Sequence, residues 1–244
     1  MVHSFNKVGM EGDLFIAYED GIKIPKIDNR ILFDMDNDPF LLSWLKENED
    51  IIPQKYGGKV PLCDKRCPDP NNNWKGHREG CLNGRYHSRV SHWFRKIVAM
   101  KVAMKKYAEN YDIVVWCDCD IVFKERLPAS FIAEVLGDYG AFYFMGPHRK
   151  SVKSGVESGF IAFSKANGGY KFIETIIDKY EDGSFRDYSR RDDSHLFEKV
   201  FNEVSVSSLD LVTHSRKGTD VMQESIFHTY FDHHKGEHWK RFDV

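Results

Sequence analysis

Two aspartates, Asp118 and Asp120, interrupt an apolar run that extends from Val114 to Phe123. Because side chains alternate faces along a β-strand, residues two apart point the same way, and charges within an apolar run need a counter-ion. A divalent cation would supply that charge. The simpler alternative is an acidic turn after a core strand, because short acidic motifs are common.

A second group of candidate ligands lies between Phe231 and Lys240, where three histidines and two lysines surround one glycine. Imidazole is a common metal ligand, lysine binds phosphate as a point charge, and glycine lets the backbone turn closely beside both. The candidates are His233, His234, Lys235 and Gly236. The alternative is a solvated basic terminus.

Two further segments carry polar groups next to apolar ones. The charge order from Arg190 to Phe197 is typical of a helix N-terminus, which Asp192 or Asp193 could cap. A capping role explains one of these acids but not both, so the other could have a catalytic or binding role. Tyr18 ends an apolar run and could either border a nucleotide base or be an ordinary core tyrosine.

The elements that must position these residues alternate between helix and strand. Helical spacing from Trp93 to Tyr107 places Phe94, Ile97 and Val98 on one face and puts Arg95, Lys96, Lys105 and Lys106 on other faces. A helix that leads into a buried strand with acidic residues at its end would deliver ligands to the carboxyl edge of a sheet, where α/β folds bind nucleotides.

The remaining periodic segments complete an α/β pattern. Expected strands are Asp13 to Tyr18, Ile31 to Met35, Ala141 to Met145, Glu157 to Phe163 and Val204 to Val212, and expected helices are Pro39 to Asn48, Ala129 to Leu136 and Gly169 to Tyr180.

Length and composition bound the class of protein. The 244 residues are 41% hydrophobic, and no linker divides them, so we expect one domain over 1–244 with an irregular insertion at about 53–89. A net charge of -2 argues against nucleic acid as a partner. We find no signal peptide or membrane span in the sequence, and we expect a soluble, cytoplasmic chain.

Five cysteines give an odd number. Cys117 and Cys119 should face away from the carboxylates and pack as small hydrophobes, which suits a reducing compartment. The insertion carries Cys63, Cys67 and Cys81, which could bind zinc or form one disulfide. Its aromatic and basic residues could instead form part of an acceptor-binding wall.

The order of these features resembles the A-type nucleotide-sugar glycosyltransferases, and among them the galactosyl/xylosyltransferase family. Single motifs are weak, but five occur in the family's order between Trp93 and Lys240. Trp93-Phe94-Arg95 resembles the family's W-x-K, Asp118-Cys119-Asp120 its D-S-D, Glu157-Ser158-Gly159 its N-T-G, Asp192-Asp193-Ser194-His195-Leu196 its D-Q-S-A-L, and His233-His234-Lys235-Gly236 its H-F-x-G.

The resemblance implies a single Rossmann-like nucleotide-sugar-binding domain with a mixed central sheet flanked by helices. It also implies that Asp118 and Asp120, with His233 or His234, hold Mn²⁺ or Mg²⁺. The metal would bridge the diphosphate of a UDP- or GDP-sugar, and the sugar would pass to a glycan or glycoprotein hydroxyl. Lys235 and Gly236 would adjoin the diphosphate, Arg95 would reach the diphosphate or the sugar, and Tyr18 would border the base.

Departures from the family pattern affect the expected mechanism. Glu157 replaces the family's asparagine and Asp193 its glutamine. A carboxylate at residue 193 could be the general base of an inverting enzyme, with Asp192 as the second candidate. The family's members are also anchored in membranes, so this chain more closely resembles the small soluble glycosyltransferases of large algal viruses, which would act in the host cytoplasm, or a bacterial relative. A metal-dependent phosphohydrolase and a non-catalytic glycan-binding module are the alternative functions.

Overall fold

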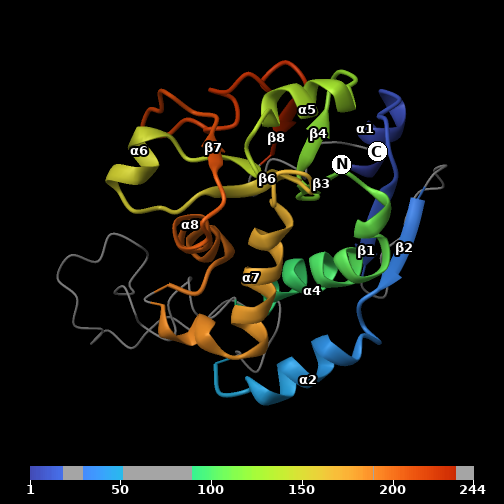
Figure 1. The fold of residues 1–244 in the computed structure, drawn as a ribbon, viewed down its shortest axis with the longest axis vertical. Coiled ribbons are helices and arrows are strands. Elements are labelled where there is room, and N and C mark those ends of the chain that lie inside the picture. Colours follow the sequence, from blue (N-terminus) through green and yellow to red (C-terminus); the bar gives the residue numbers. More distant parts are fainter. Residues whose placement is uncertain (19–29, 52–89, 189, 235–244) are drawn as a thin grey trace.

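Helices and strands alternate along the chain in the computed structural model, which describes residues 1–18, 30–51, 90–188 and 190–234 (Figure 1). The helices are α1 (Val2–Lys7), α2 (Pro39–Glu47), α4 (Val90–Tyr107), α5 (Ala129–Leu136), α6 (Gly146–Ser151), α7 (Tyr170–Glu181) and α8 (Asp193–Glu203), with 3-10 turns at Ala108–Asn110 and Ser184–Asp187. The strands are β1 (Leu14–Tyr18), β2 (Arg30–Asp34), β3 (Ile113–Cys117), β4 (Ile121–Phe123), β5 (Ala141–Phe144), β6 (Glu157–Ser164), β7 (Ser208–Asp210) and β8 (Phe231–His233).

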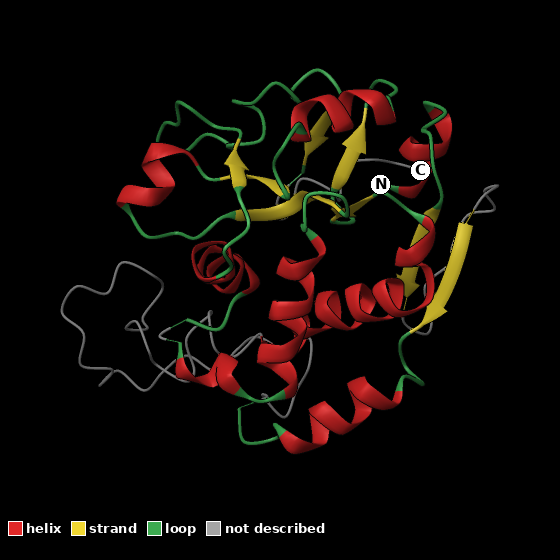
Figure 2. Ribbon diagram, in the orientation of Figure 1, coloured by secondary structure: helices red, strands yellow, loops and turns green. Residues whose placement is uncertain are grey.

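A four-stranded sheet in the order β3-β6-β5-β7 forms the centre. Strand β6 is antiparallel to β3 and β5, whereas β5 and β7 run parallel, so the sheet is mixed. Helices lie on both sides of it (Figure 2). The predicted fold class, a mixed α/β arrangement with a central sheet flanked by helices, is confirmed.

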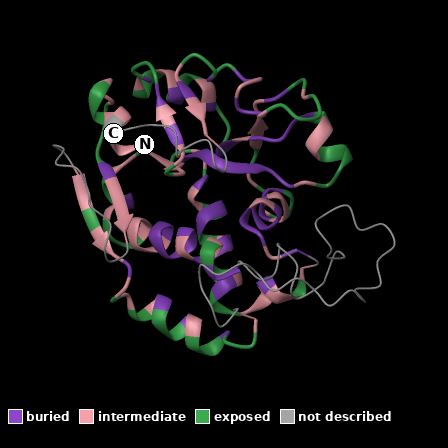
Figure 3. Ribbon diagram, turned by 180° about the vertical axis from the view of Figure 1, so that it is seen from behind, coloured by how far each residue is buried: buried purple, intermediate pink, exposed green. Residues whose placement is uncertain are grey.

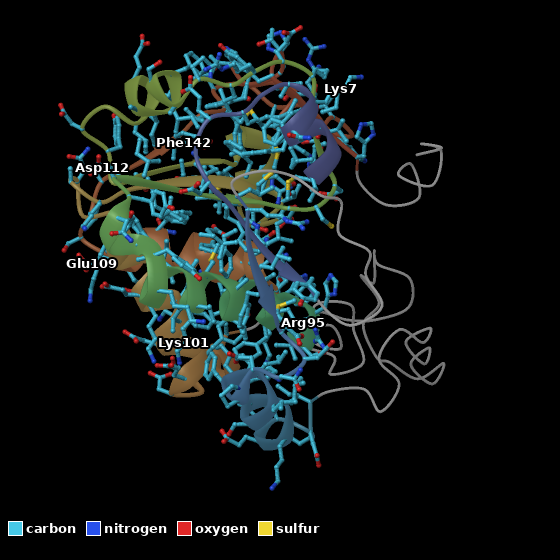
Figure 4. The ribbon with its side chains drawn as sticks, turned by 90° about the vertical axis from the view of Figure 1, so that its right-hand side faces the viewer. Lys7, Arg95, Lys101, Glu109, Asp112 and Phe142 are labelled. Atoms are coloured by element: carbon cyan, nitrogen blue, oxygen red, sulfur yellow. The ribbon has the colours of Figure 1, made fainter. Side chains whose placement is uncertain are left out.

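Two buried clusters cover the two faces of this sheet. Because side chains alternate along a strand, Ile161 and Phe163 of β6 pack with α2, α4, α7 and α8, whereas Phe160 and Ala162 pack with α5, β4 and β8. Strand β6 is buried along its whole length (Figure 3). Helix α4, which carries Arg95 and Lys101, lies below the sheet that contains Phe142 (Figure 4).

Local sequence signals explain most of these elements. Helix α2 begins with Pro39 in its first turn, and the carboxylate of Asp38 accepts a hydrogen bond from the Leu41 amide at 2.9 Å. The strands predicted near residues 14–18, 31–35, 141–145 and 157–163, and the helices predicted near 39–48, 93–107, 129–136 and 169–180, are confirmed within a few residues.

Three predictions about the strands and the cysteines are wrong. The apolar run from 114 to 123 is not one strand, because β3 ends at Cys117 and β4 begins at Ile121. The segment from 204 to 212 contains only the short strand β7. Cys119 is exposed instead of packed, because it lies in the turn between β3 and β4, whereas Cys117 does pack against the core.

The insertion at 53–89, with Cys63, Cys67 and Cys81, lies outside the described residues, as do Lys235 and Gly236. Of the helices that the structure describes, none combines the length and the apolar character needed to cross a membrane.

Candidate active site

Lys96 of α4 is a buried cation that joins two acidic segments. Its ammonium group lies 2.5 Å from the Asp193 carboxylate and 3.1 Å from that of Asp118. It also donates to the backbone carbonyl and the hydroxyl of Ser158, at 3.0 and 3.1 Å. The sequence-based placement of Lys96 on a polar face of the helix is therefore wrong, since it is only 8% exposed.

The two oxygens of the Asp118 carboxylate have different surroundings. Its Oδ1 accepts a hydrogen bond from the Trp116 indole at 2.6 Å and pairs with Lys96. Its Oδ2 lies on the other side, where a Cβ built on Gly159 would be 3.4 Å away. Asp118 follows β3 directly, and its amide donates to the carbonyl of Gly159 at 2.7 Å, which fixes its position beside β6.

Asp120 meets His233 across the β4–β8 pair. Strands β4 and β8 are antiparallel, with Ile121 opposite His233, and this pairing brings Asp120 Oδ1 to 3.4 Å from His233 Nε2. A Cβ on Gly159 would lie 3.3 Å from the same Nε2 atom. Asp118 Oδ2 and His233 Nε2 thus both lie near the space above Gly159, and Asp120 Oδ1 approaches the same His233 nitrogen.

These donors fit a hard divalent cation. Among the described residues, Asp120 Oδ1 is buried and has no hydrogen-bond partner, which is costly unless a cation satisfies it. Carboxylate oxygens and an imidazole nitrogen suit Mn²⁺ and Mg²⁺. Glu157, Asp220 and His233 form another candidate group, whose ligand atoms lie within 4.8 Å of one another, and Asp118 and Asp120 are not part of it. His233 belongs to both groups.

Charge pairing sets the protonation of the site. Burial alone would lower the pKa of Lys96, but the charges of Asp118 and Asp193 outweigh it, so the pKa is raised and the ammonium stays charged. Burial would raise the pKa of Asp193, yet Lys96 and the hydrogen bond from Ser158 hold it below its usual value. Burial raises the pKa of Asp118, and Lys96 offsets only part of that effect.

His233 is held between acids. Burial would lower its pKa, but the close carboxylates of Asp120 and Asp220 and the charge of Glu157 raise the pKa to about 9. In the absence of a metal its ring is therefore an imidazolium at neutral pH, and a cation bound at Nε2 would displace a proton.

The two neighbouring acids of α8 have different environments. Asp192 caps the helix by accepting from the His195 amide, and both of its oxygens also bind the Arg190 guanidinium at 2.9 Å. Asp193 instead turns to Lys96 and accepts from the Ser158 hydroxyl at 2.8 Å. Of the two candidates, Asp193 is the one that contacts the Lys96 cluster.

A cavity of about 1600 Å³ connects these groups with two more of the predicted residues. Its wall includes Tyr18 at the end of β1 and Arg95 on α4, together with the carboxylates and His233. His234 is placed differently, because its backbone amide donates to the Asp120 carbonyl at 2.9 Å and it is His233 whose ring approaches the Asp120 carboxylate.

Sequence reasoning missed Lys96, Trp116, Ser158 and Asp220 as members of the site. Lys96 carried a signal in the sequence, because the apolar residues Ala99 and Met100 follow it at helical spacing. Asp220 carried none, since it lies in a turn of residues with no regular pattern.

No protein-family model matches the sequence, and no curated protein matches it significantly. Among solved structures, the chain is similar to the apo form of mouse xyloside xylosyltransferase 1, with 13% identity and a TM-score of 0.35. The match covers 75% of this chain, which spans 63% of the xylosyltransferase chain. A likeness this distant carries no argument about fold or function.

Proposed function

We propose that this protein is a metal-dependent glycosyltransferase that moves a sugar from a nucleoside-diphosphate sugar to a hydroxyl of a glycan or glycoprotein. One observation carries the proposal. Asp118 Oδ2 and His233 Nε2 lie near the space above Gly159, Asp120 Oδ1 lies 3.4 Å from the same Nε2, and these groups line a cavity of about 1600 Å³ that also contains the Lys96–Asp193 ion pair. The order of motifs described in the sequence agrees with it.

Under this proposal a bound Mn²⁺ or Mg²⁺ would neutralise the charge that develops on the leaving diphosphate. Asp118, Asp120 and His233 would hold the ion, and Lys96 would keep Asp118 oriented through its Oδ1. Arg95 on the cavity wall would reach the diphosphate or the sugar, and Tyr18 would border the base. Lys235 and Gly236 would adjoin the diphosphate.

The acceptor hydroxyl would attack the anomeric carbon as the bond from that carbon to the diphosphate oxygen breaks. For inversion, a carboxylate takes the hydroxyl proton, and Asp193 is the proposed base because it lies with Asp118 at the Lys96 ammonium, whereas Asp192 caps α8 and binds Arg190. The lowered pKa of Asp193 keeps it ionised but also weakens it as a base. If Asp193 only positions the sugar, the product keeps the donor's anomeric configuration, which the ¹H coupling constant of the anomeric proton reports.

A thermal-shift screen of UDP- and GDP-sugars with and without Mn²⁺ tests the donor and the metal together. A ligand present at 100 times its Kd stabilises the native state by about 2.7 kcal/mol, which corresponds to about 5–10 °C for a chain of this size. We expect one nucleotide sugar to give this shift only with Mn²⁺. The absence of any metal-dependent shift would contradict the proposal.

Product analysis separates the proposed reaction from hydrolysis. A glycosyltransferase releases nucleoside diphosphate in proportion to glycosylated acceptor, whereas a phosphohydrolase releases inorganic phosphate without an acceptor. Asp120→Asn should abolish the metal-dependent turnover. Asp232→Asn is the matched control, because Asp232 lies on the same strand pair and binds the exposed Lys124. Equal turnover in the two variants would refute the metal assignment.

A further inference from the structure

A second acid, Asp220, approaches His233 from the side opposite Asp120. Its Oδ2 lies 2.8 Å from His233 Nδ1, while Nε2 of the same ring faces Asp120 Oδ1 at 3.4 Å. The His233 side chain is 2% exposed, so solvent does not replace either partner. The ring therefore has a defined orientation with one nitrogen towards each acid.

The position of Asp220 is fixed by its own neighbours. Its Oδ1 accepts a hydrogen bond from the Met222 amide at 3.0 Å, and this bond holds Oδ2 as the oxygen that faces the ring. One residue further on, the side-chain amide of Gln223 donates to the backbone carbonyl of Phe231 at 3.0 Å. This bond ties the segment that carries Asp220 to strand β8, which carries His233.

We infer that Asp220 is a positioning residue that orients His233 for metal binding. A neutral imidazole carries one proton, and an Nδ1–H that donates to Asp220 leaves the Nε2 lone pair directed towards the space above Gly159. Histidines that bind metals commonly donate their other N–H to a carboxylate, which fixes the tautomer and raises the basicity of the ligand. The inference rests on the proposed metal-dependent function.

The alternative role for Asp220 is that of a ligand, together with Glu157 and His233. Asp220 Oδ1 accepts from the Met222 amide and its Oδ2 lies 2.8 Å from Nδ1, whereas Asp120 Oδ1 lies 3.4 Å from Nε2, the nitrogen near the space above Gly159. Glu157 also has a protein partner, because its Oε2 accepts from Arg149 at 3.1 Å. These contacts favour Asp120 as the ligand and Asp220 as the acid behind the imidazole.

Titration of the full chain with Mn²⁺ alone, followed through the electron paramagnetic resonance signal of free Mn²⁺, tests the inference without any turnover. Loss of such a partner typically weakens metal binding about 10–100-fold. We expect this loss in Asp220→Asn and a similar or larger one in Asp220→Ala, with partial recovery in Asp220→Glu. Asp232→Asn, the matched control, should bind Mn²⁺ within about twofold of the wild type.

A second readout reports the ring directly. In ¹⁵N NMR spectra with Mg²⁺ bound, His233 should carry its proton on Nδ1, and Asp220→Ala should reduce the population of this tautomer. Circular dichroism identifies any variant that does not fold, and Asp220→Asn, which preserves the side-chain shape, then decides the result.

The possible outcomes distinguish a failure of the inference about Asp220 from a failure of the proposed function on which it rests. Failure of the wild type to bind Mn²⁺ would overturn the proposed function. Mn²⁺ affinities of Asp220→Asn and Asp220→Ala equal to that of Asp232→Asn would overturn the inference and leave the function standing. Loss of Mn²⁺ binding in Asp220→Asn as complete as in Asp120→Asn would make Asp220 a ligand, which also overturns the positioning role.

Discussion

Replacing Lys96 with methionine removes the cation that holds the two acidic segments together. Methionine is close to lysine in length and apolar, so it fills the space without the charge. The variant loses the ion pairs to Asp193 and Asp118 and both hydrogen bonds to Ser158. Two carboxylates then face each other in a buried site without a counter-ion.

The expected loss follows from burial. The side chains of Lys96 and Asp193 are each 8% exposed, so water compensates little for the missing cation, whereas Asp118 is 30% exposed and is partly relieved. Removing one partner of a buried ion pair typically costs about 3–5 kcal/mol, because the other charge is left uncompensated. We expect the free energy of unfolding of the metal-free protein to fall by about that amount at pH 7.5.

Lys101→Met is the matched control on the same helix. Lys101 pairs with Glu181 at the surface and lies over the Phe40 ring, 3.6 Å from its centroid. Exposed contacts of this kind contribute about 1 kcal/mol or less. Guanidinium chloride unfolding, followed by both tryptophan fluorescence and far-ultraviolet circular dichroism, measures the two variants and shows whether the transitions coincide.

The pH dependence gives an independent check on the cause. Without Lys96, the folded-state pKa values of Asp118 and Asp193 should rise above those of the unfolded chain, so protonation at lower pH stabilises the folded variant. The deficit of Lys96→Met should therefore shrink between about pH 7 and pH 4. A deficit within 1 kcal/mol of that of Lys101→Met, or one that does not change with pH, would refute the reasoning.

Three further predictions concern other parts of the chain. Gly159→Ala places a methyl group 2.9 Å from Met222 Cε and 3.3 Å from His233 Nε2. The affinity for Mn²⁺, measured by the same titration, should therefore fall, while the circular dichroism spectrum stays unchanged. An unaltered Mn²⁺ affinity would argue against a metal above Gly159. Burial lowers the pKa of His195 from 6.5 to about 4, so the folded state resists the proton that the unfolded chain takes up, and the wild type should lose about 2 kcal/mol of stability relative to His195→Gln from pH 7.5 to pH 5. Urea unfolding of both proteins at the two pH values measures this difference, and the same pH dependence in both would contradict the prediction. Phe94→Ala, at a fully buried core position, should cost about 3–5 kcal/mol in the same assay, and a cost below 1 kcal/mol would show that the core closes around the vacancy.

Much of the local structure was predictable because its causes lie close together in the sequence. The Asp38 cap, Pro39 in the first helical turn and the capping by Asp192 depend on contacts within three residues. Periods of 3.6 and 2 residues likewise follow from the geometry of a single element, and they located α4, α5, α7 and β6. The sequence also indicated that two acids, a late histidine and one of two further acids belong together.

The break between Asp118 and Asp120 was not predictable from the same pattern. A continuous apolar run satisfies one long strand as well as two short ones, and nothing nearby distinguishes them. The break depends on β4 leaving the central sheet to pair with β8, which lies about 110 residues further along the chain. That pairing, and not a common face of one strand, brings Asp120 to His233.

The sequence by itself therefore determined the elements and the residue types that could bind a cation, since propensity, capping and periodicity act over a few residues. Tertiary structure alone decided which of these groups meet. Lys96 became a buried counter-ion because its face of α4 packs against Ser158 and two acids from distant segments. Asp220 contacts His233 because the segment around Asp220, which has no helical or strand periodicity, folds back onto β8. Local sequence patterns do not predict contacts between separate segments.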